Sequence, residues 1–126
     1  MIFLAILVTG DVGDNVRSVE ALLSNGSSLC SLPDLPYDYY YHTQSGLVTC
    51  GGGSSTLTEI SCYTFTNGIW TKSHTLRHSR YYHSSWTSPM GIVLMGGYDS
   101  DDETTTELLT DDGQSTDYFS LKYSTR

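Results

Sequence analysis

The three cysteines of this 126-residue chain carry its most reactive side chains. Cys50 ends one predicted strand and Cys62 lies on the next, so antiparallel pairing of these strands would bring both thiols within bonding distance. We predict a Cys50–Cys62 disulfide, and buried free thiols are the alternative. Because three is an odd number, Cys30 would stay unpaired and could link two copies of the chain.

Histidines are the next candidates, as metal ligands. His74 and His78 are four residues apart, a spacing that puts two side chains on one face only if the segment is helical. This segment straddles a predicted strand end and a loop, so we expect no metal there. His42 and His83 occupy the same position in two repeats, which is typical of a structural hydrogen-bonding residue.

An acidic loop gathers oxygen atoms that could bind calcium: Asp99, Asp101, Asp102 and Glu103. It lacks the central glycine of an EF-hand loop, and we favour a solvated loop. The chain shows no nucleophile elbow, phosphate-binding loop or paired-carboxylate motif. We therefore predict no enzymatic activity, no metal and no cofactor.

Tyrosines form the best candidate binding surface. The candidates lie in two clusters one repeat apart, Tyr39, Tyr40 and Tyr41 in the first, and Tyr81 and Tyr82 in the second. Because side chains alternate along a strand, about half of each run must point away from the core, leaving amphipathic rings for a partner protein or a sugar. Packing between neighbouring sheets is the alternative that we favour.

The N-terminal part of the chain carries two features that bear on its location. Asn25 starts an Asn-Gly-Ser glycosylation sequon on a predicted hairpin, which matters only if the chain is exported. Residues 1–8 are apolar enough for a secretory signal but lack a preceding Lys or Arg and a clear cleavage site, so we favour a first strand. The location stays open: the cysteines, the sequon and the apolar start favour an extracellular protein, and a cytoplasmic one is the alternative.

The elements that must position these residues recur along the chain. Apolar runs that end in glycine occupy residues 4–10, 46–52 and 91–97. Each is followed by a tight turn, and the turns Asn25-Gly26, Asn67-Gly68 and Asp112-Gly113 are 42 and 45 residues apart. A fixed period of this kind indicates a repeat architecture. An Asx-Gly pair is the strongest short hairpin signal, because both central residues of a type I′ turn need a positive φ.

Strand propensity and these turns predict three units of antiparallel strands. The expected strands are 2–8, 19–23 and 27–32 in the first unit, 39–44, 46–50, 60–66 and 69–74 in the second, and 80–86, 91–95, 105–110 and 117–122 in the third. The last two units are therefore predicted to be four-stranded meanders, and the first to lack its opening strand. The fold class is all-β.

These residues resemble the kelch repeat of β-propellers, which pairs a double glycine with a Tyr and a Trp further on. Gly51-Gly52, Tyr63 and Trp70 match that motif in the second unit, and Arg80 and His83 match the family's first strand. The third unit keeps Gly96-Gly97 but has Leu108 or Leu109 in place of the Tyr and Ser115 in place of the Trp. The first has Gly10-Asp11 instead of two glycines.

The resemblance implies three propeller blades: a partial blade at residues 1–35 and full blades at 36–78 and 79–126. Since propellers close with four to eight blades, the ring would be incomplete. We expect the chain to belong to a longer polypeptide or to associate with copies of itself.

The charge and hydropathy of the chain limit the classes of partner that it could bind. Six Lys and Arg against 14 Asp and Glu give a net charge of −8, which would repel nucleic acid and anionic lipid. No apolar run is long enough for a membrane-spanning helix. We therefore expect a non-catalytic kelch-repeat module for protein–protein interaction or self-assembly. A secreted glycan-binding or extracellular-matrix protein is the alternative, followed by a fragment of a copper oxidase-like enzyme.

Overall fold

The chain forms antiparallel sheets and no helix within the residues that the structure, a computed structural model, describes: 5–9, 19–29, 32–36, 41–53, 60–97 and 104–123. The first sheet contains β1 (Ala5–Thr9), β2 (Val19–Leu23) and β3 (Ser28–Leu29). The middle sheet contains β4 (Thr43–Ser45), β5 (Val48–Cys50), β6 (Ser61–Thr66) and β7 (Ile69–Thr75). The third contains β8 (Ser84–Ser88), β9 (Gly91–Met95), β10 (Thr105–Leu109) and β11 (Ser115–Ser120).

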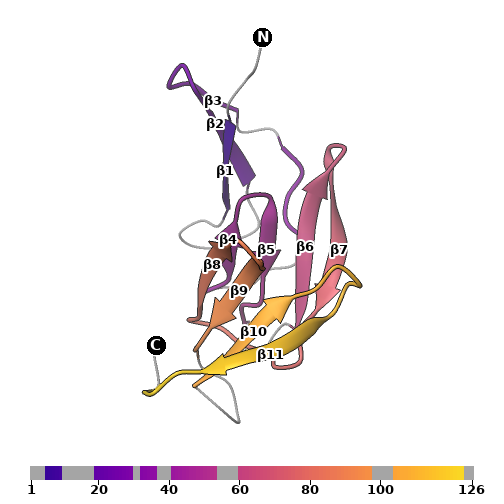
Figure 1. Ribbon diagram of the computed structural model, residues 1–126. Coiled ribbons are helices and arrows are strands. Elements are labelled where there is room, and N and C mark those ends of the chain that lie inside the picture. The colour runs from indigo at the N-terminus through magenta and orange to yellow at the C-terminus, as the bar shows by residue number, and fades with distance from the viewer. Residues whose placement is uncertain are drawn as a thin grey trace.

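Each sheet is a meander, because strands that follow one another in the sequence pair with one another. The all-β class and the two four-stranded antiparallel sheets predicted from the sequence are thus confirmed. Figure 1 shows β4 and β5 of the middle sheet beside β8 and β9 of the third. The described sheets do not close into a ring.

The middle and third sheets are built alike, down to individual hydrogen bonds. In the middle sheet the Gly51 amide donates to Ser61 O at 3.2 Å, and the Leu76 amide donates to Ile60 O at 2.6 Å. The corresponding bonds in the third sheet run from Gly96 to Thr105 O at 3.0 Å and from Leu121 to Thr104 O at 2.7 Å. The sequence repeat therefore corresponds to a structural repeat.

The three Asx-Gly turns differ in their backbone conformation. Asn67 and Gly68 both have positive φ angles, 54° and 79°, as a type I′ turn requires. At the other two turns only the glycine does, with φ 84° at Gly26 and 81° at Gly113. The expectation of positive φ at both positions is wrong there, because these loops are longer and the Asx side chain accepts hydrogen bonds within them. The Ser27 amide donates to Asn25 Oδ1 at 3.0 Å.

Two strands start later than the sequence predicts. β4 begins at Thr43 rather than at residue 39, and β8 begins at Ser84 rather than at residue 80. Tyr41 and Tyr82, at equivalent positions, have φ angles of 60° and 56°. A left-handed backbone cannot belong to an extended strand, so each tyrosine turns the chain just before its strand begins.

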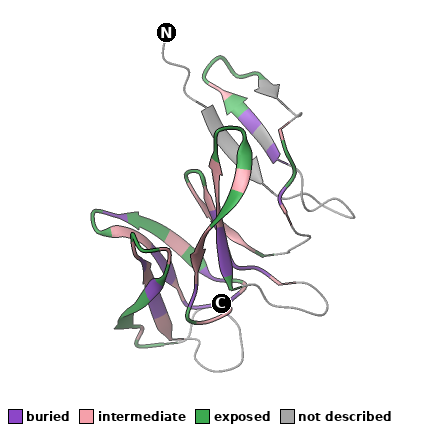
Figure 2. Ribbon diagram, turned by 90° about the vertical axis from the view of Figure 1, so that its right-hand side faces the viewer, coloured by how far each residue is buried: buried purple, intermediate pink, exposed green. Residues whose placement is uncertain are grey.

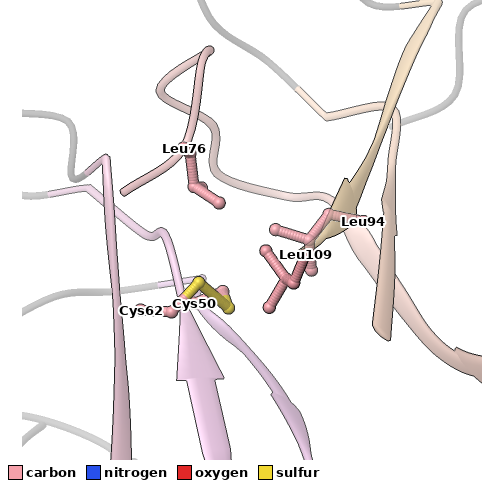
Figure 3. Packing of buried hydrophobic residues seen from close by; sticks show 5 residues of the cluster. All are labelled: Cys50, Cys62, Leu76, Leu94 and Leu109. Atoms are coloured by element: carbon pink, nitrogen blue, oxygen red, sulfur yellow. A yellow bond between two sulfur atoms is a disulfide. The ribbon is translucent and has the colours of Figure 1, made fainter. Parts of the chain in front are cut away.

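Buried side chains hold neighbouring sheets together in two clusters. The cluster between the middle and third sheets contains Cys50, Cys62, Leu76, Leu94 and Leu109, and Figure 3 shows the cysteine pair facing the two leucines of the third sheet. The other joins the first and middle sheets through Val19, Ala21 and Leu35, with Phe65 and Trp70 packed against them. Figure 2 shows exposed positions at the hairpin loops and along β11.

Candidate functional site

The double glycines Gly51-Gly52 and Gly96-Gly97 leave room for the backbone of the segment that precedes β8. The Gly52 amide donates to Arg80 O at 2.8 Å. A Cβ atom on Gly51 would lie 2.5 Å from Arg80 O and 2.7 Å from His83 Cε1. A Cβ atom on Gly97 would lie 2.8 Å from His83 Cβ. Because real Cβ atoms do not approach so closely, glycine is required at both positions, which also have positive φ.

His83 is buried between these two glycines. Its Nε2 hydrogen-bonds Thr43 Oγ1 at 2.7 Å, and so joins the start of β8 to the start of β4. Burial is the main cause that lowers the pKa of His83 to about 3, and the charges of Arg80 and His42 contribute to this shift. The ring is therefore neutral at physiological pH and serves as a hydrogen-bonding part of the junction between the sheets.

Arg80 forms a buried ion pair with Glu107, a residue that the sequence analysis did not select. Arg80 Nη2 lies 2.6 Å from Glu107 Oε2, and Nη1 donates to Gly96 O at 2.8 Å. The two side chains are 3% and 0% exposed. Glu107 Oε1 accepts hydrogen bonds from the Arg77 amide and the Ser115 hydroxyl, at 2.6 and 2.7 Å. One carboxylate thus joins β10, β11 and the segment between β7 and β8.

A sequence signal for Glu107 does exist. The residue lies two positions before Leu109 on β10, on the face that packs in the core. A carboxylate on an apolar face needs a charged partner, and the resemblance to the kelch motif indicates Arg80.

The tyrosine cluster lies where β4 and β8 begin. Tyr41 and Tyr82 stack on one another with ring centroids 3.9 Å apart and planes inclined by 26°. Tyr81 lies against Tyr82 in a tilted arrangement at 5.3 Å. The two stacked rings are 54% and 46% exposed, so they contact each other and solvent at once. Tyr39 and Tyr40 lie outside the described residues.

The predicted disulfide is confirmed: Cys50 and Cys62 are opposite one another on β5 and β6 and are bonded through their sulfur atoms. Trp70 lies on β7, where its Nε1 donates to Pro33 O at 3.0 Å and its ring packs against Phe65. Tyr63 lies on β6 opposite Thr49 and is half-buried. These residues therefore contribute to the sheets and their contacts.

The remaining predicted residues divide into two groups. Asn25 is exposed at the hairpin between β2 and β3, in a position that a glycan could occupy. Cys30, Gly10-Asp11 and the acidic residues Asp99, Asp101, Asp102 and Glu103 lie outside the described residues.

The described residues contain no group of three or more His, Cys, Asp or Glu side chains that could hold a metal ion. His74 and His78 contact different groups of the third sheet: His74 Nε2 lies 3.0 Å from Thr110 O, and His78 Nε2 lies 3.3 Å from Asp117 Oδ1. Each of these two histidines thus contributes a contact to the junction between the middle and third sheets.

Comparison with known proteins identifies no relative, since no protein-family model matches the chain and a search of curated proteins finds no match. In the part of the chain that the structure describes, no helix has the length and apolarity needed to cross a bilayer.

Proposed function

We propose that this chain is a non-catalytic interaction module of the kelch-like β-propeller type, whose third sheet binds a second copy of the chain. The proposal rests on the unequal covering of the two four-stranded sheets. The middle sheet packs against other sheets on both faces, through the two buried clusters. On the third sheet, Leu94 and Leu109 belong to the cluster shared with the middle sheet.

On the opposite face of the third sheet, the exposed Trp86 and the half-buried Leu108 lie on either side of Val93, which is itself buried. Trp86 pairs with Val93, and Val93 with Leu108. Because paired residues share a face and neighbours on a strand alternate, this row lies opposite to Leu94. Trp86 is 49% exposed, and the nearby β8–β9 turn exposes Met90 by 69%. Exposed aromatic and methionine side chains of this kind favour a protein interface.

A second copy is the partner that the fold itself favours. Sheets of this chain already cover one another on both sides of the middle sheet, so another copy supplies a surface of the same shape and chemistry. Since each copy carries a net charge of −8, the copies repel one another at low ionic strength. Association should therefore strengthen as salt is added.

Sedimentation equilibrium of the purified chain tests this proposal. We expect reversible dimers whose dissociation constant falls with added salt, and Trp86→Ser should weaken the dimer by about tenfold or more, as loss of a central aromatic anchor does. Ile69→Ser, at a 59% exposed position on β7, is the matched control. A chain that stays monomeric at every concentration and unfolds cooperatively would contradict the proposal.

A further inference from the structure

Tyr41 and Tyr82 have the arrangement that oxidative coupling of two phenols requires. Their ring centroids are 3.9 Å apart and their planes are nearly parallel, at 26°. A side-chain hydrogen bond with Tyr41 is the main cause that raises the pKa of Tyr82, so the two hydroxyl ends lie together. When two nearly parallel phenols meet at their hydroxyls, the carbons ortho to those hydroxyls also face one another. Both rings are about half exposed, so a soluble oxidant can reach them.

The backbone fixes this arrangement. Both tyrosines have left-handed φ angles, 60° and 56°, which are outliers for a bulky side chain. Such conformations persist only where the surrounding structure determines them. Here the Tyr82 amide donates to Tyr41 O at 3.2 Å, so main chain and rings are held as a pair. Two groups held in contact react as if each were at a very high local concentration.

From this geometry we propose that Tyr41 and Tyr82 are a modification site, at which peroxide-driven oxidation forms a dityrosine that joins the middle and third sheets covalently. The two residues lie on segments that lead into β4 and β8, strands that also contact one another through Ser85 Oγ and Gln44 O at 3.4 Å. A carbon–carbon bond between the rings would thus cross the junction between the middle and third sheets.

The reaction balances with hydrogen peroxide as the oxidant and a haem peroxidase as the catalyst. Each phenol gives up one electron and one proton and becomes a phenoxyl radical. The radicals pair to form a bond between their ortho carbons, and each ortho hydrogen then moves to its own phenol oxygen. The peroxide O–O bond breaks, and its two oxygens take up the two electrons and two protons as two waters. The chain loses two hydrogen atoms in total.

Treatment of the whole chain with peroxidase and peroxide tests the proposal. We expect monomeric protein lighter by two hydrogens, the fluorescence of dityrosine, and a cross-linked peptide that contains Tyr41 and Tyr82. Because the reaction is intramolecular, its yield should not change on roughly tenfold dilution. The cross-linked product should also have a higher Tm than the untreated chain, because the bond restricts the unfolded state.

Variants separate this site from ordinary surface oxidation. Tyr41→Phe and Tyr82→Phe keep the rings and should each abolish the monomeric cross-link. Tyr123→Phe is the control, because Tyr123 is 71% exposed and its ring lies beside Lys122, and it should leave the cross-link unchanged. A cross-link that survives Tyr82→Phe, maps to another tyrosine such as Tyr81, or forms only between chains would overturn the proposal. Even if a variant does not fold, peptide mapping of the oxidised chain without substitutions shows which two tyrosines are cross-linked.

Discussion

His83 should control the acid stability of the junction between the middle and third sheets. Its pKa is lowered to about 3 in the folded chain, while the unfolded chain binds the proton near pH 6.5. The unfolded state therefore binds more protons between these values, and stability is lost as the pH falls through them, by up to about 1.4 kcal/mol per pH unit. Above about pH 6.5 the contribution is complete.

Urea denaturation of the chain and of His83→Gln between about pH 7 and about pH 4 measures this effect. The variant should be less stable at neutral pH, because it loses the fitted contact with Thr43, and the difference in unfolding free energy should shrink as the pH falls. His78→Gln is the control, since His78 is only partly buried. A difference that stays constant with pH would show that His83 titrates normally.

At the scale of single residues, the sequence identifies important positions but not the residues that they contact in the fold. His83 recurs with His42 one repeat earlier, and Arg80 matches the resemblance to the kelch motif, so the sequence alone indicates both. The sequence gives no reason to prefer Thr43 to other polar residues on neighbouring strands, and it distinguishes Glu107 only as a carboxylate on the apolar face of β10. Their importance comes from three-dimensional contacts between segments 27 and 40 residues apart.

The elements were predicted well where a local turn determines them. The hairpin at Asn67-Gly68 fixes β6 and β7 because both residues tolerate the left-handed backbone that the turn needs. The sequence predicts the starts of β4 and β8 too early because no feature of a run of tyrosines indicates a positive φ, which is rare for aromatic residues. The contacts with the next sheet, not local preference, hold these residues in that conformation.

The Arg80–Glu107 pair should decide how firmly β10 and β11 are attached to the segment before β8. Glu107→Gln leaves a buried guanidinium without its counter-charge, and we expect unfolding to become easier by about 3–5 kcal/mol. The double variant Arg80→Met with Glu107→Leu removes both charges and should recover much of that loss. Chemical denaturation of both variants provides the comparison.

The exposed pair of Arg77 and Asp117, whose closest charged atoms are 3.8 Å apart, supplies the control. Asp117→Asn should change stability by less than about 1 kcal/mol, as is usual for solvated ion pairs. If Glu107→Gln were equally mild, the buried pair would contribute little to the attachment of β10 and β11.

On the scale of the whole molecule, the repeat period predicts the two four-stranded meanders, and the pairing of adjacent strands predicts the disulfide, but the way the sheets cover one another could not be predicted. A strand's own residues determine which of its faces is apolar. Which sheet covers that face depends on the connections between units, such as the segment that brings Arg80 beside Gly52.

The disulfide offers a direct measure of how firmly the third sheet is held. Cys50 and Cys62 are 3% and 0% exposed, and Figure 3 shows Leu94 and Leu109 on the side of the disulfide that faces the third sheet. A reductant can therefore attack the sulfur atoms only after the sheets separate, and the reduction rate should follow the population of that open state. Leu94→Ala should raise this population, because loss of a buried leucine side chain costs about 2–5 kcal/mol.

We expect the thiols of Leu94→Ala to appear at least about tenfold faster under native conditions, since each 1.4 kcal/mol changes an equilibrium constant tenfold. The milder Leu109→Val should lie between this variant and the unmodified chain, and it keeps the test valid if Leu94→Ala does not fold. Ile69→Ala, at an exposed position on β7, should leave the rate unchanged. Equal rates in all four proteins would mean that the disulfide is reached by a path that does not separate the sheets. In that case the cluster around Leu94 would not be what holds the third sheet in place.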